Sequence, residues 1–153
     1  MTTPLLFDTS IYVAILRNAA FAAEFRPRYL RDIPLTYCSS VVVQELLAGT
    51  RTPRQRRQVA ALYEPFERVR RIITPSHLVW KEVGSVVAVL LAETPQLRSK
   101  LASGLLNDIL IALSGRSTGA RVVTGNGHDF RLIRQFRVFA LEVIEPERPS
   151  AQQ

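Results

Sequence analysis

Three acidic side chains, distant from one another in the sequence, lack any basic neighbour along their own elements. Asp8 directly follows a short apolar run, Glu45 lies in an apolar helix predicted over residues 41–48, and Asp108 lies in another predicted over 105–114. Helical neighbours are three and four positions apart, and neither Glu45 nor Asp108 has a Lys or Arg at that spacing. Because an unpaired buried carboxylate is costly, such groups pair, bind a metal ion or take up a proton.

Each of these acids also has a purely structural interpretation. Asp8 is placed to cap the helix that follows it, and a first-turn acid such as Asp108 is favoured by the helix dipole. Glu45 fits the polar edge of an amphipathic helix. Glu82 is a rival candidate, since its helical neighbours are also largely apolar.

Two further polar side chains follow a strand predicted over residues 121–124. Asn126 and Asp129 come after its end, although Asp129 is also placed to cap a short helix predicted over 131–135. In an open parallel sheet, the carboxyl ends of the strands form the rim at which ligands bind. We therefore expect Asp8, Glu45, Asp108 and the residues after the fourth strand to share that rim.

The ligand types available to a metal ion are restricted. Cys38 is the only cysteine, and His77 and His128 are the only histidines, so no zinc set of thiolates and imidazoles is available. Gathered carboxylates repel each other, and a hard cation with oxygen ligands removes that repulsion. This donor set favours Mg²⁺ or Mn²⁺, and the chemistry that uses such a site is phosphodiester hydrolysis by metal-activated water.

Strands and helices alternate along the chain, which predicts an α/β fold. We expect a single domain over residues 1–145 with a mostly parallel central sheet of four to five strands and helices on both faces. Residues 146–153 are predicted to be a flexible tail. The strands are predicted over residues 5–7, 34–38, 69–75, 121–124 and within 138–144. Further helices are predicted over 11–16, 21–30 with an interruption at Pro27, about 58–69, and 77–93 with Trp80 in the core.

The charge balance favours polyanionic partners. Twenty Lys and Arg against thirteen Asp and Glu give a formal net charge of +7. One basic group precedes the predicted fourth helix, and it is either a solvated helix start or a nucleic-acid surface: Arg51, Arg54, Arg56 and Arg57. A lone cysteine and the lack of a long apolar run predict a soluble, cytoplasmic protein without a membrane partner.

Four motifs, in this order, resemble those of PIN-domain ribonucleases, and the closest likeness is to the VapC toxins of bacterial toxin–antitoxin pairs. They are Leu5-Leu6-Phe7-Asp8-Thr9-Ser10, Ser39-Ser40-Val41-Val42-Val43-Gln44-Glu45-Leu46, Asn107-Asp108-Ile109 and Thr124-Gly125-Asn126-Gly127-His128-Asp129-Phe130. The resemblance covers nearly the whole chain. It implies a PIN-like fold and a metal-dependent endoribonuclease, usually a homodimer, silenced by an antitoxin whose C-terminal segment enters the acidic cleft.

The resemblance also assigns roles to residues. It implies an acidic triad of Asp8, Glu45 and Asp108, of which Asp8 and Asp108 hold the metal, and it implies a further catalytic acid at Asp129. Thr9 and Thr124 are expected to orient the carboxylates.

Asn126 departs from the family pattern, because many members have an acid there. We therefore expect one tightly bound metal ion rather than two. The same departure favours an alternative, a catalytically impaired PIN-like module that binds RNA.

Overall fold

The computed structural model describes residues 2–145, and it is built around a five-stranded sheet. All pairings are parallel, and the strand order is β3-β2-β1-β4-β5. The bounds are β1 Leu5–Phe7, β2 Thr36–Ser39, β3 Ile72–Ile73, β4 Arg121–Thr124 and β5 Leu141–Val143. The predicted α/β class and the parallel sheet are confirmed, with five strands. The predicted flexible tail lies outside the described residues.

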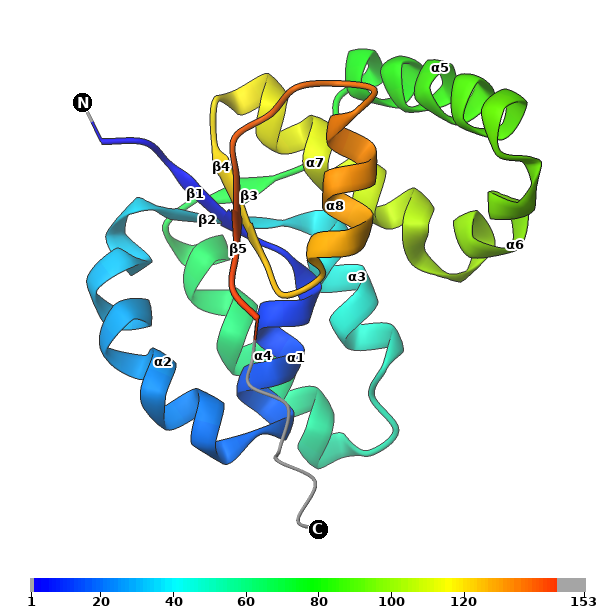
Figure 1. Cartoon of the computed structure of the whole chain (residues 1–153). Coiled ribbons are helices and arrows are strands. Elements are labelled where there is room, and N and C mark those ends of the chain that lie inside the picture. Colours follow the sequence, from blue (N-terminus) through cyan, green and yellow to red (C-terminus); the bar gives the residue numbers. More distant parts are fainter. Residues whose placement is uncertain (1, 146–153) are drawn as a thin grey trace, which may run out of the picture.

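The helices form two layers, one on each face of the sheet (Figure 1). The chain moves from β1 outward to β3, crosses back to β4 and continues to β5, so right-handed crossovers put the early and late helices on opposite faces. The early helices are α1 Thr9–Arg17, α2 Ala19–Asp32, α3 Ser40–Ala48 and α4 Pro53–Arg68. The late helices are α5 His77–Glu93, α6 Arg98–Lys100, α7 Leu106–Thr118 and α8 Gly127–Arg134.

The core is made of the apolar side chains of β1 and β4 and the helix faces that cover them. Leu6, Phe7, Val122 and Val123 are fully buried. Gly115 of α7 approaches β4 so closely that an added Cβ would lie 2.8 Å from Val122 Cγ2. Within residues 2–145, no helix has the length and apolar character needed to cross a bilayer.

Several element boundaries differ from the sequence prediction. Helix α2 runs through Pro27 without interruption, because Phe21 and Phe25 stack at 5.2 Å between ring centroids and anchor the helix on the core. Strand β3 is shorter than predicted, since Arg70 has a left-handed φ of 58° that delays the start of the strand. Trp80 is 52% exposed, so its predicted place in the core is wrong.

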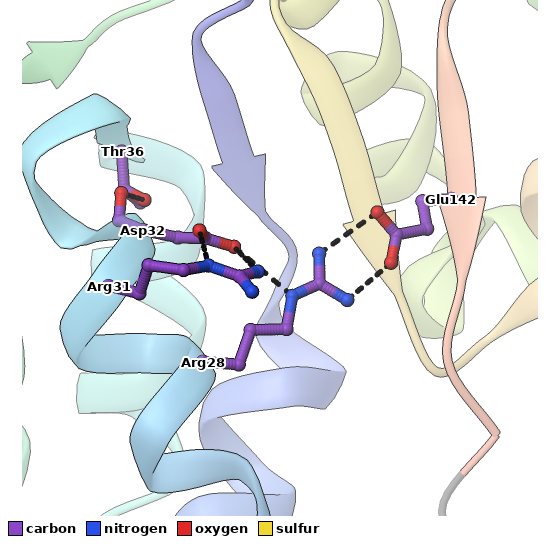
Figure 2. Close-up of polar contacts among 5 residues, drawn as sticks. All are labelled: Arg28, Arg31, Asp32, Thr36 and Glu142. Carbon is purple, nitrogen blue, oxygen red and sulfur yellow. Dashed lines mark hydrogen bonds and ion pairs between the residues drawn. The ribbon is translucent and has the colours of Figure 1, made fainter.

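An ion-pair network joins helix α2 to the edge strand β5 (Figure 2). The guanidinium of Arg28 binds both oxygens of Glu142, with Nη2 2.9 Å from Oε1, and its Nε donates to Asp32 at 3.1 Å. Arg31 Nε donates to the other oxygen of Asp32 at 2.8 Å. The hydrogen bond from Arg31 is the main reason why the pKa of Asp32 lies below its ordinary value. The network therefore holds α2 against the far edge of the sheet.

Candidate functional site

The candidate site lies where the direction of the chain across the sheet reverses. Strands β1 and β4 are neighbours, and the chain leaves them toward opposite edges of the sheet. Asp8 follows β1 directly, and Thr124 is the last residue of β4. Such a switch point forms a crevice at the carboxyl ends of the strands, which is the usual ligand site of open α/β sheets.

Asp8 is almost completely buried, at 2% exposure, and hydroxyl groups bind both of its oxygens. Oδ1 accepts from Ser10 N at 2.7 Å and from Ser10 Oγ at 2.5 Å, while Oδ2 accepts from Thr124 Oγ1 at 2.6 Å. Burial raises the pKa of Asp8, and these hydrogen bonds oppose that rise. Asp8 is thus both the N-cap of α1 and a buried acid of the crevice, so its two interpretations are compatible.

Ser10 was not predicted as a site residue, although it contacts three groups there. Besides Asp8, its Oγ accepts from the backbone N–H of Gly125 at 2.8 Å and lies 3.4 Å from Thr124 Oγ1. Ser10 links the ends of β1 and β4, which are neighbours only in the folded chain, so its position in the sequence does not indicate this role.

Glu45 and Thr9 come from different helices and meet at the same crevice. Thr9 Oγ1 donates to Glu45 Oε1 at 2.7 Å, which ties α1 to α3. The contact places one carboxylate oxygen of the half-buried Glu45 directly beside the residue that follows Asp8.

Asp108 lies in the first turn of α7, and the charges of all the other acids of the site affect its pKa. Its pKa is raised to about 8, first by burial and then by the negative charges of Asp8, Glu45 and Asp129. The other three acids, which are scattered over more than a hundred positions of sequence, therefore converge electrostatically on Asp108. Near neutral pH it retains its proton in the metal-free protein.

Asn126 connects the remaining polar side chains. Its Nδ2 donates to Asp129 Oδ2 at 2.9 Å and to Asp108 Oδ2 at 3.4 Å, and its backbone N–H donates to Thr124 Oγ1 at 2.9 Å. Asn126 is the N-cap of α8, which begins four residues before the helix predicted over 131–135. Asp129 thus lies in the first turn and does not cap the helix, so that interpretation is wrong.

Asp129 has a cationic partner that the sequence did not indicate. Lys100 Nζ lies 2.5 Å from Asp129 Oδ1. Burial acts to raise the pKa of Asp129, but the interactions with Lys100 and Asn126 outweigh it, and the pKa falls below its ordinary value. Lys100 lies between the helices predicted over 77–93 and 105–114, where the sequence predicts no element that would place it near Asp129.

As arranged, no three Asp, Glu, His or Cys side chains in residues 2–145 stand ready to hold a metal ion. Asp8, Glu45 and Asp108 therefore do not form a ready-made set of three metal ligands in the metal-free protein. Polar neighbours engage these carboxylates instead: hydroxyls bind Asp8 and Glu45, and Asn126 binds Asp108. The donors nevertheless suit a hard divalent cation, because all are oxygens and their mutual repulsion raises the pKa of Asp108.

The rival acid Glu82 does not belong to this site. Its Oε1 accepts from Arg137 Nε at 2.9 Å and from Arg116 Nη1 at 3.1 Å. These contacts satisfy Glu82 through two ion pairs, which join α5 to α7 and to the segment after α8.

The predicted basic group lies at the start of α4. Its four side chains are exposed: Arg51, Arg54, Arg56 and Arg57. The first turns of α4 also line a cavity of about 150 Å³ that reaches Glu45. The cavity therefore lies next to Glu45, and the exposed arginines lie at the start of the helix that lines it.

Comparison with known proteins agrees with this geometry. The sequence profile of the PIN domain matches residues 5–135. The chain belongs to the PIN domain family. Among curated proteins, no sequence matches it.

Solved structures with a similar fold include chains of toxin–antitoxin complexes. A chain of the DNA-bound VapBC complex from Salmonella typhimurium superposes with a TM-score of 0.63 and 20% identity, over 93% of this chain and 98% of that one. A chain of FitAcB from Neisseria gonorrhoeae gives a TM-score of 0.61 and 18% identity, over 90% and 95%. A chain of VapBC2 from Rickettsia felis gives 0.58 and 21%, over 93% and 99%. At these identities the likeness shows the fold alone, and the PIN crevice holds the acids described above.

Proposed function

We propose that this PIN-domain protein is a Mg²⁺- or Mn²⁺-dependent endoribonuclease that acts as the toxin of a toxin–antitoxin pair. The observation that carries the proposal is the convergence of Asp8, Glu45 and Asp129 on Asp108 at the sheet's switch point. A protein gains no stability by gathering acids in this way. The arrangement is explained if a divalent cation and an RNA phosphate enter the crevice.

The roles proposed for the side chains follow from their contacts. Asp8 and Asp108 hold the metal ion, whose chemistry is to activate a water molecule and to stabilise charge on the phosphate. Thr124 and Ser10 fix the orientation of Asp8. Thr9 holds one oxygen of Glu45, and we assign to the other oxygen the acceptance of the proton from the attacking water.

We place the antitoxin in the cavity next to Glu45. Its apolar walls include Val13, Leu16 and Leu46, and Leu16 is 39% exposed although it is a large apolar side chain. A partner segment with an apolar side chain followed by a basic one would fill the cavity and neutralise the acids. The VapBC and FitAcB complexes, which contain toxin and antitoxin chains together, support this assignment by analogy of fold.

The remaining surfaces suit RNA and a second copy of the chain. The exposed arginines at the start of α4 would hold the RNA backbone beside the acids: Arg51, Arg54, Arg56 and Arg57. For the proposed homodimer, α5 presents the exposed apolar side chains Leu78, Trp80 and Val89, which are 71%, 52% and 46% exposed. We expect the protein to act in the cytoplasm, where its RNA substrates are.

The alternative is a PIN module that binds RNA without cutting it. Asn126 favours this alternative, because an amide occupies a position where an acid would add a charged ligand. The two proposals differ in one measurement, the cleavage of RNA in Mg²⁺ or Mn²⁺ compared with EDTA.

The test uses the purified wild-type protein without its antitoxin. Cleavage in Mg²⁺ that is lost in EDTA and in Asp8→Asn supports the nuclease. Binding of RNA in EDTA with no cleavage in Mn²⁺ would support the binding module instead. A rise in melting temperature with millimolar Mg²⁺ is expected for the wild type, since binding to the folded state alone stabilises it.

A further inference from the structure

Lys100 is a cation inside an otherwise acidic site. Its ammonium lies 2.5 Å from Asp129 Oδ1, and its side chain is 37% exposed while that of Asp129 is 11% exposed. The chain has only two lysines, and the other, Lys81, is exposed on α5. The Lys100 charge also acts on Asp108, where it opposes the rise in pKa caused by the acids.

An irregular backbone segment carries Lys100 to this position. Between α6 and α7, residues Leu101–Leu105 form a π-type turn in which Gly104 has a φ of 145°. Side chains with a Cβ rarely adopt that conformation, so the bend depends on glycine. On a straight helix Lys100 and Asp108 would lie about 12 Å apart along the axis. The bend lets both join one network through Asp129 and Asn126.

The charges around Asn126 disfavour the binding of a second metal ion. Its Nδ2 group points its hydrogens at Asp108 and Asp129, and such a donor repels a cation. Asp129, in turn, is already neutralised by Lys100. Asp8 and Asp108 then remain to hold one divalent ion, with Glu45 beside them as the proton acceptor.

Nucleases with two metal ions use the second ion to stabilise charge on the phosphate and the leaving oxygen. In this chain the protonated amine of Lys100, beside Asp129, is available for that task. An ammonium has three N–H donors, and Asp129 engages the group at one side, while the Lys100 side chain as a whole is 37% exposed.

We propose that Lys100 supplies the second cation of the site, so that the protein cuts RNA with one divalent ion and one ammonium. This inference rests on the proposed nuclease function. In the reaction, the water oxygen bonds to phosphorus and the water proton passes to Glu45, while the bond to the leaving oxygen breaks and that oxygen takes up a proton from solvent. Lys100 keeps its own protons and donates an N–H to a phosphate oxygen.

The experiment compares Lys100→Met with Lys81→Met, the only other lysine of the chain. Mn²⁺ stoichiometry is measured by electron paramagnetic resonance, and RNA cleavage is measured against Mg²⁺ concentration. We expect one Mn²⁺ per chain in both variants and in the wild type. We expect cleavage at saturating Mg²⁺ to fall about 10²- to 10³-fold in Lys100→Met, as for loss of one charge-stabilising donor, and to stay unchanged in Lys81→Met.

A second variant tests whether charge is the property that matters. Adding Asn126→Asp to Lys100→Met replaces the amide by an acid, and we expect the double variant to bind a second Mn²⁺ and to depend more steeply on Mg²⁺. If Lys100→Met does not fold, Lys100→Gln, which keeps a hydrogen-bond donor for Asp129, takes its place.

The outcomes separate this inference from the proposed function. If the wild type cleaves RNA and Lys100→Met cleaves equally well, Lys100 only pairs with Asp129 and the inference is overturned, while the nuclease proposal stands. Two Mn²⁺ per wild-type chain would also overturn it. A wild type that binds RNA but never cleaves it overturns both.

Discussion

Replacing Asp108 by Asn should stabilise the metal-free protein at alkaline pH although it removes a site residue. The pKa of Asp108 is raised from an ordinary 3.8 to about 8, by burial and by the other acids. As the pH rises from about 4 to about 8, the unfolded chain loses this proton while the folded protein keeps it. Folding stability therefore falls with rising pH over that window, and it does so because of Asp108.

The size of the effect follows from the same pKa. At 1.36 kcal/mol per pH unit, a rise from 3.8 to about 8 corresponds to roughly 6 kcal/mol at most. Water entry and local relaxation reduce such penalties, so we expect Asp108→Asn to gain about 2–4 kcal/mol at pH 9 and little at pH 4. The new amide is similar in shape and retains an oxygen that accepts from Asn126.

Urea unfolding in EDTA at pH 4, 7 and 9 measures this difference. If the free energy of unfolding falls by about 2 kcal/mol per molar urea, the urea midpoint of Asp108→Asn should exceed that of the wild type by roughly 1–2 M at pH 9. Glu93→Gln, which alters an exposed acid on α5, serves as the control and should show no such trend. An Asp108→Asn midpoint that equals or falls below the wild-type midpoint at pH 9 would refute the convergence of charges on Asp108.

Two further substitutions test other contacts. Thr124→Val removes the hydroxyl that donates to Asp8 at 2.6 Å. We expect RNA cleavage to fall about 10-fold or more and the free energy of unfolding, measured in urea, to fall by about 1–2 kcal/mol. Unchanged cleavage would show that the hydroxyl does not orient Asp8. Arg28→Ala breaks the bidentate pair with Glu142 and should destabilise the protein by about 1–2 kcal/mol, whereas Arg26→Ala, on the exposed side of α2, should cost less than about 0.5 kcal/mol. Equal effects of the two arginine variants would show that the network does not hold β5.

Much of the fold followed from local patterns in the sequence. The apolar run before Asp8 and the β-branched residues of 121–124 predicted the two central strands, and alternation with helices predicted the parallel sheet. The predicted boundaries of helices and strands were wrong where tertiary contacts override local preference. Pro27 does not interrupt α2, because aromatic stacking on the core outweighs one lost backbone hydrogen bond.

The candidate site was predictable where an acid lacks a local partner, and less so where the partner is distant. The screen by helical spacing found Glu45 and Asp108 but also admitted Glu82, whose arginine partners are 34 and 55 positions away. Lys100 could not be found in this way. Its contact with Asp129 depends on the bend at Gly104, and no periodic pattern indicates such a bend.

The most direct test of the central claim is RNA cleavage by purified wild type and Asp8→Asn, assayed in parallel in Mg²⁺ and in EDTA. If the buried acids of the PIN crevice form a metal-dependent nuclease, only the wild type in Mg²⁺ will cut internal phosphodiester bonds. Cleavage by Asp8→Asn at the wild-type rate, or cleavage by the wild type in EDTA, would contradict it.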